Sequence, residues 1–101
     1  AAGAALPMLT RILNTPDLSP RARLEFGRLR ARARLALGQD AVTDWESVFG
    51  RDPCPENAVL LLQAHLNRRD RNCRRIRELL ERFSDHPLIS PIAEQARGLC
   101  P

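Results

Sequence analysis

Cysteine and histidine are the residues of this chain best suited to chemistry, and it holds five of them. They are Cys54, Cys73, Cys100, His65 and His86. Four such side chains are enough for a zinc site, but these spacings match no zinc pattern. The odd number of cysteines and the lack of a Cys-x-x-Cys pair do not resemble a disulfide framework. The sequence therefore predicts no metal site, no cofactor and no cysteine framework.

The environments of two cysteines can be read from their positions. Cys73 shares a helical stripe with Ile76, Leu80 and Phe83, so we expect it to be a small buried hydrophobic residue. Cys54 lies at the N-cap position of a predicted helix, where the helix dipole would lower the pKa of a thiol. No histidine is paired with Cys54 along the sequence, and a catalytic thiol is therefore not predicted.

The carboxylates also show no catalytic pattern. Asp44 and Glu46 are two residues apart, so they face different sides of a helix. Asp52 and Glu56 flank a proline turn, as helix-end and helix-start residues do. The five glycines are scattered and form no phosphate-binding loop. We expect the chain not to be an enzyme.

Positive charge is gathered in two segments. The chain has sixteen arginines, no lysine and a net charge of +4, while residues 19–37 carry +5 and residues 68–82 carry +4. Such segregation suits nucleic-acid phosphates or an acidic protein partner. The use of arginine alone is typical of a GC-rich genome, and we expect a bacterial source.

The two basic segments differ in their local partners. Residues 68–82 offer three pairs at i, i+4 spacing, which favour a solvated, salt-bridged surface: Arg74–Glu78, Arg77–Glu81 and Glu78–Arg82. In residues 19–37, Arg21, Arg28 and Arg32 have only Glu25 to neutralise them. This second group is the better candidate for binding. Nucleic acid is the less favoured ligand, because Trp45 and the three phenylalanines lie on predicted core stripes and leave no stacking platform.

Proline punctuation and apolar periodicity predict six helices that must position these residues. The expected ranges are 4–13, 20–37, 41–49, 55–68, 71–83 and 90–99. No segment alternates with a period of two, so strands are not expected. In the first helix Met8, Leu9, Ile12 and Leu13 lie on one side. In the last, Ile92, Ala96 and Leu99 form an apolar stripe that we expect to be exposed.

The chain also repeats itself. Residues 20–53 and 55–87 share a layout of long helix, polar break, shorter helix and closing proline, which is typical of stacked helical hairpins. Helix 20–37 has two apolar arcs, one holding Phe26, Leu29 and Leu37 and the other Leu24 and Leu35. A helix with two apolar faces needs neighbours on two sides, as an inner helix of such a stack has.

The layout resembles tetratricopeptide (TPR) repeats over about residues 20–87. Leu62, Leu66, Leu79 and Pro87 stand where that family keeps large apolar residues and its terminal proline. The resemblance implies an all-α superhelix of about three helical hairpins, in one domain over residues 1–101, that binds other proteins. The family's carboxylate clamp does not carry over, because apolar residues such as Leu60 and Ala64 occupy its positions.

The sequence therefore predicts a non-catalytic protein-interaction module, an adaptor or a secretion or assembly factor. Its concave, partly basic groove would bind an acidic or amphipathic segment of a partner as a helix. The expected groove residues are Arg21, Glu25, Arg28, Arg32, Leu60, Ala64 and Asn67. Two alternatives stay open: an arginine-rich nucleic-acid-binding repeat, and a structural or homodimerising piece of a larger solenoid. With no secretory signal pattern, no membrane span and no initial methionine, we expect a cytoplasmic fragment or processed form, with the periplasm as the alternative.

Overall fold

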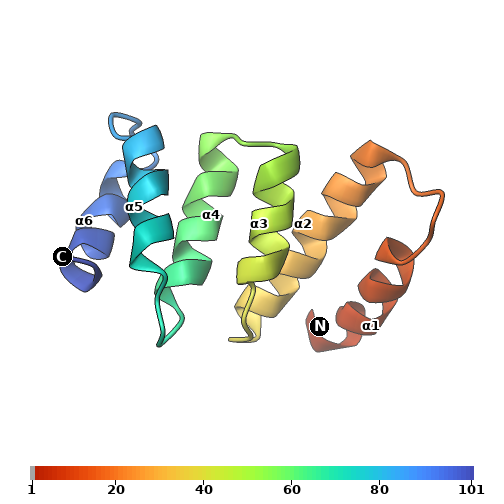
Figure 1. Cartoon of the computed structure of the whole chain (residues 1–101). Coiled ribbons are helices and arrows are strands. Elements are labelled where there is room, and N and C mark those ends of the chain that lie inside the picture. The colour runs from red at the N-terminus through yellow and green to blue at the C-terminus, as the bar shows by residue number, and fades with distance from the viewer. Residues whose placement is uncertain (1) are drawn as a thin grey trace.

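The computed structural model describes residues 2–101, which form six α-helices joined by short connections (Figure 1). The helices are α1 (Ala2–Leu13), α2 (Pro20–Ala36), α3 (Val42–Arg51), α4 (Pro55–Leu66), α5 (Cys73–Arg82) and α6 (Ser90–Leu99). Their ends lie within two residues of the predicted ones, and no strand occurs in residues 2–101. The all-α prediction is confirmed.

Local signals in the sequence set the ends of α2. Ser19 is its N-cap, and the Ser19 hydroxyl oxygen accepts a hydrogen bond of 3.1 Å from the backbone N–H of Ala22. Pro20 follows at the first helical position, where its missing N–H costs nothing. Gly38, just after the helix, has a φ of +70°, a left-handed conformation that glycine adopts without steric cost. The chain can therefore turn sharply toward α3.

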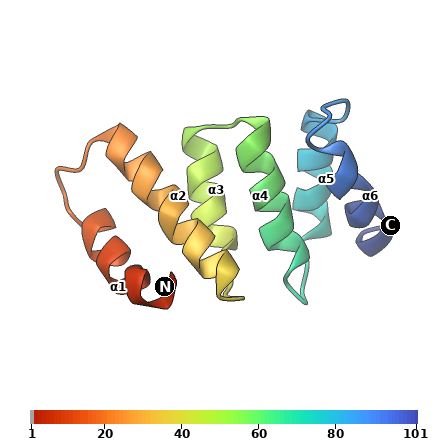
Figure 2. The same ribbon diagram turned by 180° about the vertical axis from the view of Figure 1, so that it is seen from behind.

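The helices follow one another in an elongated row measuring 41 × 25 × 20 Å, with α1 at one end and α6 at the other (Figure 1). Each of the first four helices packs on the next, and α4 also contacts both α5 and α6. Helices α3 and α5 lie toward the viewer in Figure 1, whereas α2 and α6 lie toward the viewer from behind (Figure 2). The TPR-like superhelix remains a prediction.

The core is centred on α3 and α4. Trp45 of α3 and Ala58, Leu61 and Leu62 of α4 are completely buried. The apolar run in α4 is buried on several sides because the helix has neighbours in α3, α5 and α6. A single buried stripe on α3, ending in Phe49, agrees with the predicted periodicity.

The burial of four apolar residues differs from the prediction. Leu29 of α2 and Leu37, the residue that follows the helix, are 50 % and 43 % exposed, so the first predicted apolar arc is only partly covered. Met8 of α1 is exposed, because α1 packs only its Leu9 side deeply. In α6 the stripe expected to be exposed is divided: Leu99 faces outward as predicted, while Ala96 is buried. No helix within residues 2–101 combines the length and the apolar character that crossing a bilayer requires.

Candidate functional site

Three of the six arginines of α2 are engaged with neighbouring parts of the protein. Arg23 donates hydrogen bonds to the carbonyl oxygens of Leu13 (3.0 Å) and Thr15 (3.2 Å), which ties α2 to the end of α1. Arg30 and Arg34 both bind the carboxylate of Asp44, at 3.0 and 2.6 Å. These three side chains hold α1, α2 and α3 together, so they are not available to a partner.

Asp44 and Glu46, which the sequence showed only as facing different sides of a helix, anchor two ion networks. Asp44 is 6 % exposed and faces α2. Glu46 faces the other way, where its oxygens accept hydrogen bonds from His65 of α4 (3.1 Å) and from Arg75 of α5 (2.9 Å). Burial alone would raise the pKa of Glu46, but these hydrogen bonds and charges outweigh it and lower the pKa. The opposite directions of the two carboxylates follow from their spacing, but their partners could not be read from it.

Two arginines of α2 remain without such partners. Arg21 pairs with Glu25 at 3.2 Å on the exposed surface. Arg28 and Arg32 form no ion pair or side-chain hydrogen bond with any residue in the described part of the chain, and the Nε atom of Arg28 is buried without a partner. Of the predicted binding arginines, Arg28 and Arg32 are therefore the two whose N–H groups are available to a partner.

Arg28 and Arg32 line an open hollow of about 390 Å³ together with Glu25 and Leu29. Leu29 had been assigned to an apolar packing face, yet it is half exposed and lies between the two arginines. The hollow therefore combines two free cations with an apolar contact. Helical spacing could have indicated this grouping, because Arg32 lies three residues after Leu29 and four after Arg28, the separations at which helix side chains are neighbours.

The α4 residues of the predicted set lie further along. Ala64 and Asn67 line a second hollow of about 520 Å³ with the two turns that carry Gln39 and Arg69. Leu60 is half-buried on the same helix and lines neither hollow, and neither does Arg21. The structure thus divides the predicted set between two hollows instead of collecting it in one.

Helices α2 and α4 run in the same direction, as Figure 1 shows. At one end Arg68 lies 3.6 Å from Asp40. At the other end the pKa of Glu56 is lowered by hydrogen bonds from its own backbone N–H and from the Cys54 thiol, and also by the charges of His86 and Arg28.

The cysteines overturn three predictions: that the chain has no disulfide framework, that Cys73 is only a buried hydrophobic residue, and that the pKa of Cys54 is lowered. Cys73 and Cys100 form a disulfide that joins the first residue of α5 to the residue after α6, with Cα atoms 5.4 Å apart. Cys73 is thus not simply a buried hydrophobic residue. With only three cysteines in the chain, the sequence did not indicate this disulfide. Cys54 is the remaining free cysteine. Its pKa is raised, because desolvation outweighs the hydrogen bond from the Asn57 backbone and nearby carboxylates add to the rise.

One of the three ion pairs predicted on the surface of α5 is present. The pair Arg74–Glu78 is present at 3.6 Å. Arg77–Glu81 and Glu78–Arg82 are not among the ion pairs of residues 2–101. Glu78 instead also binds Arg75 at 3.3 Å. Over the same residues no group of three His, Cys, Asp or Glu side chains is placed to hold a metal ion. Comparison of the chain with protein-family models, curated proteins and solved structures gave no match.

Proposed function

We propose that the chain is a non-catalytic protein-interaction module, an adaptor or a secretion or assembly factor, that binds a partner segment between α2 and α4. The observation that carries this proposal is the selective freedom of Arg28 and Arg32. Arg23, Arg30 and Arg34 of the same helix are engaged with neighbouring residues, while these two flank a half-exposed leucine in an open hollow.

The chemistry of the hollow favours an acidic, amphipathic partner segment. Apolar side chains of the partner would bury Leu29, and its carboxylates would pair with the two arginines, which lie one helical turn apart. Burial supplies most of the affinity, while the charges set the association rate and the choice of partner. The backbone groups of α2 and α4 are used within their own helices. A bound segment that satisfies its own backbone, an α-helix, therefore fits better than an extended one.

A photo-crosslinking amino acid at position 29, inside the hollow, tests the proposal in host extract. Capture of a discrete protein that survives nuclease treatment is expected, and Arg28→Glu with Arg32→Glu should weaken that capture roughly tenfold. The melting temperature should not fall, because neither arginine forms an ion pair or a side-chain hydrogen bond within residues 2–101. Arg77→Glu with Arg97→Glu, which reverses two exposed arginines elsewhere, is the matched control.

The alternatives predict different results in the same experiment. Crosslinked material that disappears with nuclease would support the nucleic-acid-binding repeat, and its affinity would fall steeply with salt. Capture of the chain by itself would support the oligomerisation segment. A double variant that unfolds would show that the two arginines belong to the packing, and the binding site would then be wrong.

For the compartment, we propose an oxidising location such as the periplasm, the alternative to the cytoplasm expected from the sequence. The support is the Cys73–Cys100 disulfide, because such bonds persist outside the reducing cytosol. Alkylation of the protein as isolated from its host, followed by mass spectrometry, should label Cys54 only. Labelling of all three cysteines would instead place the chain in a reducing compartment.

A further inference from the structure

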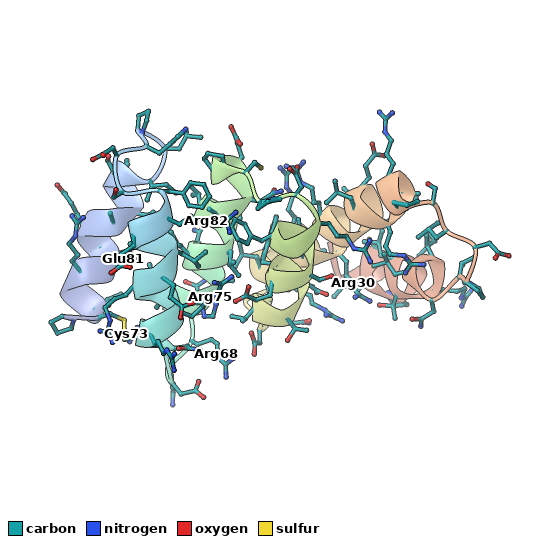
Figure 3. The ribbon with its side chains drawn as sticks, turned by 45° about the horizontal axis from the view of Figure 1, so that its top comes forward. Arg30, Arg68, Cys73, Arg75, Glu81 and Arg82 are labelled. Carbon is teal, nitrogen blue, oxygen red and sulfur yellow. A yellow bond between two sulfur atoms is a disulfide. The ribbon has the colours of Figure 1, made fainter. Side chains whose placement is uncertain are left out.

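Three arginines follow one another from the turn before α5 along the side of α5 that faces α3 and α4 (Figure 3). They are Arg68, Arg75 and Arg82, spaced seven residues apart. The first two each hold two carboxylates. Arg68 binds Asp40 and Asp70, at 3.6 and 3.1 Å.

Arg75, the second arginine of the row, likewise binds two carboxylates. Arg75 binds Glu46 at 2.9 Å and Glu78 at 3.3 Å. The side chain of Arg82 is exposed, and within residues 2–101 it forms neither an ion pair nor a hydrogen bond. The partner that helical spacing offers it, Glu78, is occupied by Arg74 and Arg75. Arg82 is therefore the member of the row whose charge is not balanced.

Two aromatic rings hold Arg82 in place. Its guanidinium carbon lies 5.1 Å from the ring centroid of Phe49 and 5.6 Å from that of Phe83, within the range of cation–π attraction. The rings contact each other edge to face, with centroids 6.0 Å apart, and Phe49 is buried. The guanidinium thus rests on a fixed support, while its N–H groups keep no partner within the protein.

We propose that Arg82, stacked on Phe49 and Phe83, is a binding site for a single carboxylate of a partner protein. A guanidinium fork matches a carboxylate in a bidentate geometry. An exposed arginine must normally be ordered when it binds, which costs about 0.5–1.5 kcal/mol for a flexible side chain. The two rings have already ordered Arg82. This site lies away from the hollow of Glu25, Arg28, Leu29 and Arg32, and does not depend on the proposed function.

The surrounding charges favour a carboxylate over a phosphate. Glu78 and Glu81 lie on the same helix, and Asp85 follows it three residues after Arg82. These acids repel a doubly charged phosphate more strongly than a carboxylate. The saturated arginines further along the row offer no second contact to a polyanion.

The test is an NMR titration of the arginine Nε–H resonances with sodium acetate at constant ionic strength. Arg77, an exposed arginine on the same helix with no ring against it, is the internal control. We expect the Arg82 resonance to respond with an apparent Kd roughly five-fold below that of Arg77. Phe83→Leu, which removes one half-buried ring, should bring the two values together. Propionamide, which is uncharged, should shift neither resonance.

Three results would overturn the proposal. An Arg82 response no stronger than that of Arg77 would show that the rings confer no advantage. A stronger response to inorganic phosphate than to acetate would replace the carboxylate with a phosphate. A full response in a folded Phe83→Leu protein would show that stacking on this ring is irrelevant. Each outcome leaves the α2 hollow, and the photo-crosslinking test at position 29, untouched.

Discussion

Asp44 is the residue whose replacement most directly tests how α2 is held on α3. Its carboxylate is 6 % exposed and lies 3.0 Å from Arg30 Nη2 and 2.6 Å from Arg34 Nη1. Asp44→Asn keeps the size of the side chain and removes its charge. Two arginines then face each other with no counter-charge, and the Nε atom of Arg30 is already buried without a partner.

The expected loss follows from the burial of the three side chains. Removing one partner of a buried ion pair costs about 3–5 kcal/mol. The Arg30 and Arg34 side chains are 21 % and 31 % exposed, so they regain some hydration, and the cost falls to the lower end, about 3 kcal/mol. For a domain of this size each kcal/mol lowers Tm by at least about 4 °C, so Tm should fall by about 12 °C or more.

Urea denaturation followed by circular dichroism measures this free energy of unfolding. Glu25→Gln is the matched control, because it removes the same charge from an exposed pair with Arg21 and should cost less than about 0.5 kcal/mol. Equal stabilities for the two variants would refute the buried-pair account. Replacing the whole triad with apolar residues (Asp44→Leu, Arg30→Met and Arg34→Met together) should recover most of the loss, since no charge is then left unpaired.

Three other perturbations have defined outcomes. Cys73→Ser with Cys100→Ser should cost about 3.5 kcal/mol in urea denaturation, the entropy of closing a loop of 27 residues, and reductant should destabilise only the parent protein to that extent. Because the pKa of Glu46 is lowered by folding, the stability that it contributes is complete above its ordinary value of 4.5 and is lost as the pH falls through the lower folded pKa. Thermal melts of Glu46→Gln should therefore show a weaker loss of stability in acid than the parent. Gly38→Ala should cost about 1 kcal/mol at any pH, because alanine is strained at a φ of +70° although nothing crowds the position, and an unchanged Tm would contradict this.

Local rules of sequence account for the helices but not for the exposure of every residue in them. Ser19-Pro20 and Gly38 bound α2 as their types require, since capping and left-handed conformations depend on nearest neighbours. Leu29 shows the limit of such rules. Its periodicity placed it on a packing face, yet no neighbouring helix covers it fully, and it is half exposed.

The partners of charged residues could be predicted only when they lie on the same helix. Arg74 and Glu78 are one turn apart, and their pair is present. Arg75 also reaches Glu46, 29 residues earlier in the chain. That contact depends on how α5 packs beside α3 and α4, and no spacing within one helix encodes it. Glu78 is consequently shared, and Arg82 turns to aromatic rings instead of the predicted carboxylate.

The sequence by itself determined the all-α class, the number of helices and their ends, because periodicity, caps and prolines act over a few residues. It also identified Arg28 and Arg32 as cations short of local acids. Only the tertiary structure decided which arginines stay free, and it joined Cys73 to Cys100. Both outcomes depend on distances between helices, which are set by packing of the whole core and not by any single segment.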